Sequence, residues 1–185
     1  DGEVALQLAG VDISHVTQAD GICSGVGNVQ LQTDEKGTSN RIIVVPGANM
    51  ALGPEDVAFL EETISDYAMV LLQLEIPMDV NVLVAGYAAR AGVPVMLNSA
   101  PYAPLPPELL AALSFLSPNE HEAELLTGIR ITDLDTARRA AQLLLMQGAV
   151  VLMRDDLKES CYVEGVQYLP LEECLPRTDV ILTIG

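Results

Sequence analysis

Large aromatic side chains are scarce in this sequence, which contains no Trp and only two Phe. Half of the residues are nevertheless apolar, so a sizeable core has to be built from aliphatic side chains. Such a composition is typical of α/β proteins, whose parallel strands are buried on both faces and are rich in Val, Ile and Leu. The length of 185 residues suits one domain.

Basic residues are also few, with nine Lys and Arg against 26 Asp and Glu, and the formal net charge is −17. The nine basic residues form no block along the chain. A chain this acidic is repelled by nucleic acid and by anionic membranes, so we predict neither as a partner. We interpret the acidity as a feature that favours solubility, with a binding role as the alternative.

Cysteines and long apolar runs are scarce as well. The three Cys, at positions 23, 161 and 174, have no metal-ligand spacing, and an odd number without pairing logic indicates a reducing, cytoplasmic location. No apolar run reaches the roughly 18 residues of a membrane span. The chain starts as the second half of a helix and ends as a strand, so we expect the central segment of a longer protein.

The spacing of apolar residues predicts regular alternation of helices and strands over much of the chain. A helix at 1–10 is followed by two strands, 22–33 and 41–47, around a polar turn. The elements predicted next are helix 54–67, strand 68–75, helix 77–92, strand 93–99, helix 105–113, strand 114–117, helix 119–128 and helix 133–148. Alternation with short connections predicts a mostly parallel sheet with helices on its faces.

Residues 149–178 break this alternation. Either 149–153 or 179–185 could supply the next strand of the sheet. We favour the second segment, because a strand that ends in Thr and Gly suits a ligand site in the following loop. Residues 150–178 then form an insertion.

Polar residues follow the ends of the predicted strands. In a parallel sheet, ligands bind beyond the carboxyl ends of the strands, so these residues should line one edge. The residues in question are Gln73, Glu75, Asn98, Ser99, Asn119, Thr183 and Gly185.

Asn119 and Glu122 open the predicted helix 119–128 and allow two interpretations. Asn at the first position and Glu three residues later form a capping box, in which two side chains satisfy free backbone N–H groups. The same helix start also favours phosphate, and a carboxylate there can hold Mg²⁺ through water. The spacing alone favours the cap.

Six segments taken together resemble the ribokinase-like family, the sugar kinases of the phosphofructokinase-B type. They are SGV (24–26), VVPGANMALGPEDV (44–57), LLQLEIP (71–77), VMLNSAPYAPLPPELL (95–110), LSPNEHEAELLTGI (116–129) and VILTIG (180–185). The resemblance implies a three-layer α/β/α fold with a mostly parallel sheet, present here as one partial kinase domain over residues 1–185. Residues 22–46 would be part of a small β lid.

The resemblance also assigns roles to individual residues. It implies that Glu75 binds sugar hydroxyls, that Asn119 contacts nucleotide phosphate and that Glu122 organises the Mg²⁺ shell. It places Thr183 and Gly185 at the start of the ATP-binding turn. Asn98 would lie at the edge of the site, where the family has Asn-Pro-Ala-Pro and this chain has Asn-Ser-Ala-Pro at 98–101.

Two motifs of the family are absent from the 185 residues. One is an early Gly-Gly-rich sugar segment. The other is Gly-Ala-Gly-Asp, whose N–H groups bind the developing anion and whose Asp is the catalytic base. We therefore expect no catalytic residue in this chain, a base Asp beyond Gly185, and no kinase activity from the 185 residues alone.

The resemblance implies that the intact protein transfers the γ-phosphate of ATP to the primary hydroxyl of ribose. The segments GAN (47–49) and QLE (73–75) favour ribose. Its cofactors would be ATP and Mg²⁺, with a monovalent cation as a further candidate, and lid strands would pair in a homodimer. The alternatives are a kinase of adenosine or another sugar, a non-catalytic binding protein of the same fold, and an unrelated α/β module.

Overall fold

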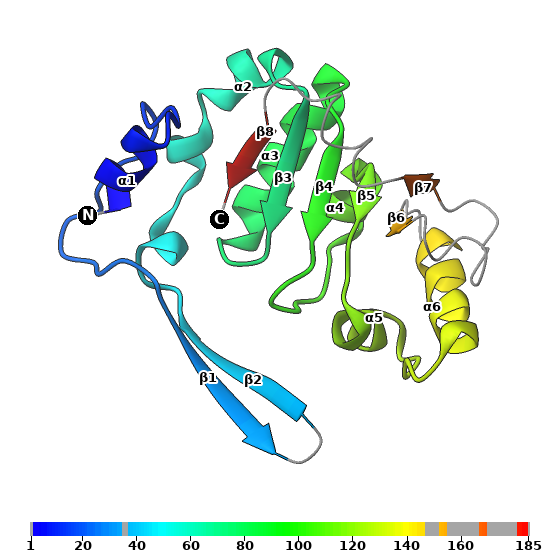
Figure 1. Cartoon of the computed structure of the whole chain (residues 1–185). Helices are drawn as coiled ribbons and strands as arrows, with labels where there is room; N and C mark the ends of the chain where they lie inside the picture. Colours follow the sequence, from blue (N-terminus) through cyan, green and yellow to red (C-terminus); the bar gives the residue numbers. More distant parts are fainter. Residues whose placement is uncertain (1, 35–36, 147–151, 155–166, 170–180, 185) are drawn as a thin grey trace. The chain divides into compact units, whose positions relative to one another are not determined.

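A parallel sheet is formed by the apolar strands that the sequence predicts. The computed structural model describes residues 2–34, 37–146, 152–154, 167–169 and 181–184. Its main sheet has the order β5-β4-β3-β8, and every neighbouring pair is parallel (Figure 1). The strands are β3 (Met69–Gln73), β4 (Val95–Asn98), β5 (Phe115–Leu116) and β8 (Ile181–Ile184). All four carboxyl ends therefore lie at the same edge.

One face of strands β3 and β4 is fully buried. Val70 pairs with Val95 and Leu72 pairs with Leu97, so these four side chains share a face, and none is more than 1% exposed. Helix α3 (Met78–Ala91) contacts both strands and α4 (Pro107–Ala112). Each side chain of this size contributes about 1.5–3 kcal/mol when it is buried. The core is aliphatic, as the composition predicts.

The segment ahead of β3 is helical but not continuous. We predicted one helix over 54–67, and the structure has three short pieces instead: η2 (Pro54–Val57), α2 (Leu60–Thr63) and η3 (Ile64–Asp66). The Thr63 hydroxyl donates to the Phe59 carbonyl at 3.1 Å, a contact that bends helices. The periodic residues Val57, Leu60 and Ile64 are still buried.

Helices α5 (Glu120–Thr127) and α6 (Leu134–Met146) follow β5. Asp133 caps α6 as predicted, since its Oδ1 accepts from the N–H of Thr136 at 2.8 Å. That N–H, followed by the hydroxyl of the same residue, holds the pKa of Asp133 below its ordinary value. Helix α5 ends at Gly128, which adopts the left-handed conformation expected of a C-cap.

The choice between the two candidate strands is resolved in favour of the later one. Strand β8 joins the main sheet beside β3, whereas β6 (Leu152–Arg154) pairs with β7 (Gln167–Leu169) in a separate two-stranded sheet. Most of the proposed insertion at 150–178 lies outside the described residues, so its boundaries stay a prediction.

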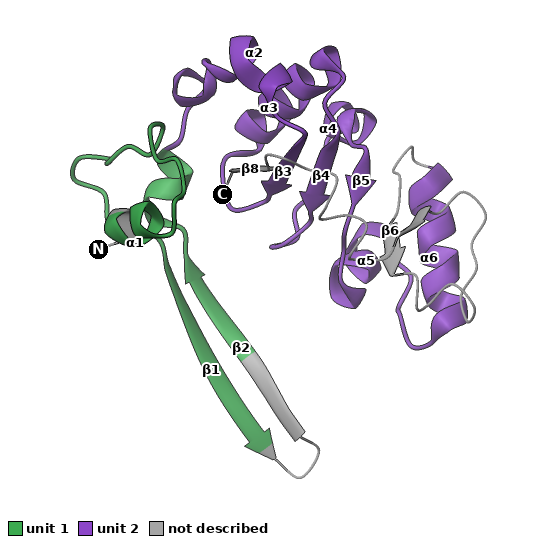
Figure 2. Cartoon of the chain, turned by 45° about the horizontal axis from the view of Figure 1, so that its top comes forward, with its two compact units in different colours: residues 1–51 green, residues 52–185 purple. Residues whose placement is uncertain are grey.

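Residues 1–51 cluster as a separate unit from residues 52–185 (Figure 2). The first unit contains α1 (Gly2–Leu8), the antiparallel hairpin β1 (Val26–Asp34) and β2 (Gly37–Val45), and η1 (Gly47–Ala51). The hairpin is longer at its tip than predicted, because pairing continues to Asp34 and Gly37. Its role as part of a lid stays a prediction.

Within the described part of the chain, no helix has both the length and the apolar character that a membrane crossing requires.

Two glycines of α3 should respond in opposite directions to replacement by Ala. Gly92 caps the helix with φ 72°, so a side chain there is strained, and Gly92→Ala should lower the free energy of unfolding by about 1–2 kcal/mol. Gly86 lies inside the helix, and an added Cβ would meet only the end of the Arg90 side chain at 3.4 Å. Gly86→Ala should therefore raise the free energy of unfolding by about 0.5–1 kcal/mol.

Chemical denaturation of the wild type and of both variants measures these changes in the free energy of unfolding. Equal destabilisation by the two substitutions would contradict the assigned ends of α3.

Candidate functional site

The carboxyl edge of the sheet collects most of the predicted site residues. Glu75 lies half-buried in the turn after β3, Asn98 is exposed at the end of β4, and Asn119 follows β5. The loops that leave β3 and β4 are joined by the Leu74 N–H, which donates to the Ala100 carbonyl at 3.1 Å. The edge is therefore a connected rim and not a set of independent loop ends.

The start of α5 is a complete capping box. Asn119 Oδ1 accepts from the N–H of Glu122 at 2.8 Å, and Glu122 Oε2 accepts from the N–H of Asn119 at 3.0 Å. Asn119 Nδ2 also donates to Glu122 Oε1 at 2.8 Å. The cap predicted from the spacing is therefore present, and Glu122 is only 6% exposed.

Ser99 adds a donor to Glu122 that the spacing did not indicate. Its Oγ donates to Glu122 Oε2 at 3.2 Å, and its side chain is fully buried. Sequence reasoning placed Ser99 at the edge but gave it no contact, because the bond joins residues 23 positions apart. The carboxylate of Glu122 thus accepts three hydrogen bonds from two residues.

This arrangement leaves a small, defined capacity for a ligand. A carboxylate has about four acceptor positions, so about one remains, on Oε1. Asn119 Nδ2 carries two hydrogens, of which Glu122 receives one. The first N–H groups of α5 have no partner inside the helix, and they attract anions.

A magnesium ion fits this donor set if phosphate and water supply most of its ligands. No group of three or more His, Cys, Asp or Glu suited to a metal occurs within the described ranges. Mg²⁺ at a nucleotide site typically uses one or two carboxylates together with substrate phosphates and waters. Glu122, with one open acceptor position, can hold such an ion through water, and it cannot form a metal cage.

A second residue that sequence reasoning missed is Asn81, on α3. Its side chain is fully buried, and Nδ2 donates to the carbonyl of Gln73, the last residue of β3, at 2.9 Å. Its Oδ1 has no partner within the described residues. The available signal was an Asn between Val80 and Val82 in the apolar part of the helix. Asn81 thereby holds the strand end that precedes Glu75.

Thr183 is not brought to the α5 tip. Thr183 lies in β8, in register with Leu71 on β3, so β3 and β4 both stand between it and β5. Three strand spacings amount to about 14 Å. Strand β8, which carries Thr183, is therefore three strand positions from β5, and Gly185 lies outside the described residues.

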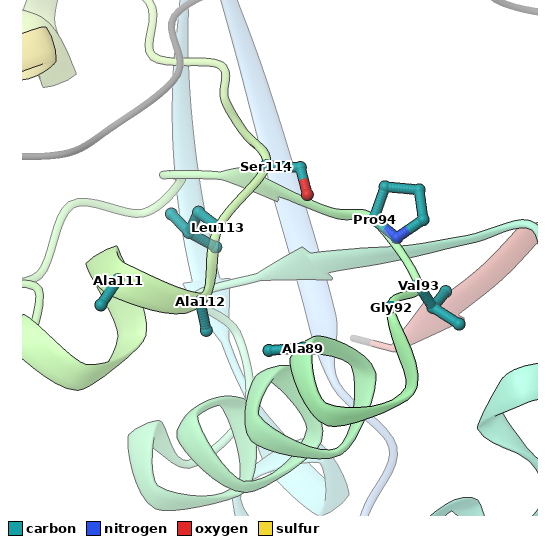
Figure 3. A pocket seen from close by; sticks show the side chains of 8 residues that line it. All are labelled: Ala89, Gly92, Val93, Pro94, Ala111, Ala112, Leu113 and Ser114. Atoms are coloured by element: carbon teal, nitrogen blue, oxygen red, sulfur yellow. The ribbon is translucent and has the colours of Figure 1, made fainter.

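The opposite, amino edge of the sheet carries a groove of about 310 Å³ (Figure 3). Its lining consists of Ala89, Gly92, Val93, Pro94, Ala111, Ala112, Leu113 and Ser114. None of these side chains is charged, so the groove offers no cationic side chain to a phosphate, and it lies at the edge opposite to the candidate site.

Replacing Glu122 by Gln should destabilise the protein. An amide keeps one acceptor oxygen and turns an NH₂ group towards donors from Asn119 or Ser99, so Glu122→Gln should lower the free energy of unfolding by about 1–3 kcal/mol. The exposed neighbour Glu120 supplies the control, and Glu120→Gln should change stability by less than about 0.5 kcal/mol. Urea denaturation measures both variants, and equal effects would contradict the observed network.

Known proteins are similar to this chain in sequence and in fold. Residues 3–185 match the model of a protein family described as "pfkB family carbohydrate kinase". Ribokinase of Haemophilus influenzae is 34% identical over 149 residues, which are 80% of this chain and 48% of that protein. Deoxyribokinase of Salmonella typhi is 30% identical over 144 residues, which are 77% of this chain and 46% of that protein.

A solved structure confirms the predicted ribokinase-like α/β fold. Arabidopsis thaliana ribokinase complexed with ribose and ATP superposes with a TM-score of 0.64 at 30% identity, over 81% of this chain and 50% of that one. The chain spans about half the length of the curated relatives that it matches. Because the family match covers nearly every residue, the chain belongs to the pfkB family of carbohydrate kinases.

Proposed function

We propose that the intact protein transfers the γ-phosphate of ATP, with Mg²⁺, to the primary hydroxyl of ribose. Membership of a carbohydrate kinase family and similarity to several ribokinases support this reaction. The observation that carries it is the Asn119–Glu122 pair at the carboxyl edge, where the helix tip still has donors for phosphate and one carboxylate acceptor position.

Charge explains why a cation belongs to the proposed site. Glu120 and Glu122 both lie in the first turn of α5, and the chain as a whole carries a net charge of −17. A triphosphate brought to this tip is repelled by carboxylates unless a bound cation neutralises it. Mg²⁺ bridging phosphate oxygens would supply that neutralisation when bound. Asn119 and the α5 N–H groups then orient the phosphate chain.

Glu75 is the proposed ligand of the sugar hydroxyls. It follows β3 in a turn whose base is held by Asn81 and by the Leu74–Ala100 bond. These bonds hold the backbone on the amino side of Glu75, and a carboxylate can accept hydrogen bonds from two neighbouring hydroxyls, as a ribose ring offers them. Thr183 and Gly185 are the proposed ends of the nucleotide site on β8, and Asn98 is its proposed edge residue. The cytoplasmic location and a monovalent cation likewise stay predictions.

An assay that follows ADP release with a panel of acceptors tests the reaction. The intact protein should use ribose with a higher kcat/KM than deoxyribose, adenosine or fructose phosphates. Glu75→Ala should raise the KM for ribose at least about tenfold, because loss of a charged hydrogen bond costs about 1.5–3 kcal/mol. The 185-residue chain should give no turnover above background, since it lacks the expected base.

Each failure of this assay has a separate meaning. Preference for deoxyribose would change the acceptor and keep the kinase. Turnover by the 185 residues would show that the base lies within them. A folded intact protein without turnover on any acceptor would support the non-catalytic alternative.

We further propose that the hairpin β1–β2 pairs with a second copy of the protein. Val29 pairs with Ile42 and Gly27 pairs with Val44, so Val29, Ile42 and Val44 share one face with Leu31. These four side chains are 46–72% exposed within the described structure. A continuous apolar face on an open hairpin typically marks an interaction surface.

Charged side chains on this apolar face of the hairpin should prevent two copies of the protein from pairing. A Val29→Lys, Ile42→Lys double variant of the intact protein should have half the wild-type mass in light scattering coupled to size exclusion. Asn28 lies on the other face of the hairpin, and Asn28→Lys should leave the mass unchanged. A wild-type protein that is monomeric, or variants that behave alike, would contradict the proposed pairing.

A further inference from the structure

Ser99 is the only described residue outside the α5 capping box whose side chain has a hydrogen bond to Glu122 given by the structure. It follows β4 directly, beside the exposed Asn98, yet its own side chain is 0% exposed. A buried hydroxyl needs a partner, and here the partner is a carboxylate oxygen at 3.2 Å.

The capping box does not require this bond. Asn119 already provides the backbone and side-chain donors that hold Glu122 to the start of its own helix. Ser99 reaches Glu122 from a different strand of the sheet. The bond therefore adds a connection between the sheet edge and the helix tip.

The extra donor has a directional consequence. The terminal torsion of a Glu side chain is broad, so a carboxylate held at one oxygen can still turn. Glu122 Oε2 accepts from Ser99 and from the Asn119 N–H, and Oε1 accepts from Asn119 Nδ2. The two Asn119 contacts oppose this rotation within the start of α5, where Asn119 and Glu122 both lie. The Ser99 bond joins Oε2 to the residue after β4 as well, so the remaining acceptor position on Oε1 keeps a fixed direction relative to the sheet edge.

We propose that Ser99 is a positioning residue, which fixes the Glu122 carboxylate so that Oε1 can accept from the water shell of a nucleotide-bound Mg²⁺. This inference rests on the proposed function. Groups that orient a metal's ligands contribute strongly to metal affinity although they do not touch the metal.

The test is a titration of the intact protein with Mg²⁺ at fixed ATP, followed by calorimetry and by thermal unfolding. Ser99→Ala should lower the apparent Mg²⁺ affinity about tenfold. Binding of ATP without Mg²⁺ should stay at the wild-type level, because Asn119 and the helix N–H groups remain. Ser99→Cys fills the same space with a weaker donor, so it should show a similar loss and replaces the Ala variant if that one does not fold.

Ser114 supplies a matched control. Its Oγ accepts from the N–H of Val95 at 3.2 Å, at the amino edge of the sheet. Ser114→Ala removes a comparable contact and should leave the Mg²⁺ titration unchanged.

The outcomes are distinct. Loss of thermal stability in both Ser99 variants with wild-type Mg²⁺ affinity would make Ser99 a structural tie and overturn the inference. The inference would also be overturned if Ser114→Ala weakened Mg²⁺ binding as much as Ser99→Ala does. Wild-type protein that binds no Mg²⁺ with ATP would overturn the proposed function and this inference with it.

Discussion

The Glu122 carboxylate is the constraint on which the candidate site depends. It is nearly buried, it carries charge in a strongly acidic chain, and it accepts three hydrogen bonds. A buried charge is tolerated only when such bonds replace its hydration. The same bonds fix the start of α5, join it to the end of β4, and set the direction in which a further donor can approach. The same Asn119–Glu122 arrangement therefore serves as the helix cap and as the proposed ligand site.

The sheet makes this geometry possible. Parallel pairing of β3, β4 and β5 brings their carboxyl ends to one edge, so residues from three separate strand–loop junctions become neighbours. The aliphatic face formed by Val70, Leu72, Val95 and Leu97 keeps those strand ends in place. Short-range polar contacts then hold the loops: Asn81 holds the end of β3, and Leu74 connects to Ala100. Packing sets the edge, and hydrogen bonds orient the groups along it.

Features with a local cause could be predicted from the sequence. The Asn119–Glu122 box, the Asp133 cap and the Gly92 end depend on residues a few positions apart. The contacts of Ser99 and Asn81 were missed because they join separate elements, and no spacing rule predicts them. The break within 54–67 was missed because the apolar period continues across the Thr63 side-chain bond that bends it. The neighbour of β8 also depends on tertiary pairing, so the distance between Thr183 and Asn119 could not be anticipated.

Membership of the pfkB family indicates carbohydrate kinase chemistry. The proposed role of the carboxyl edge of the sheet is to bind the nucleotide for that chemistry. The most direct measurement is a crystal structure of the intact protein with Mg²⁺ and a non-hydrolysable ATP analogue. The account predicts phosphate oxygens within hydrogen-bond distance of the Asn119 amide and of the first N–H groups of α5, with a water joining Mg²⁺ to Glu122 Oε1. A triphosphate bound elsewhere, with the α5 tip in contact only with solvent, would contradict it.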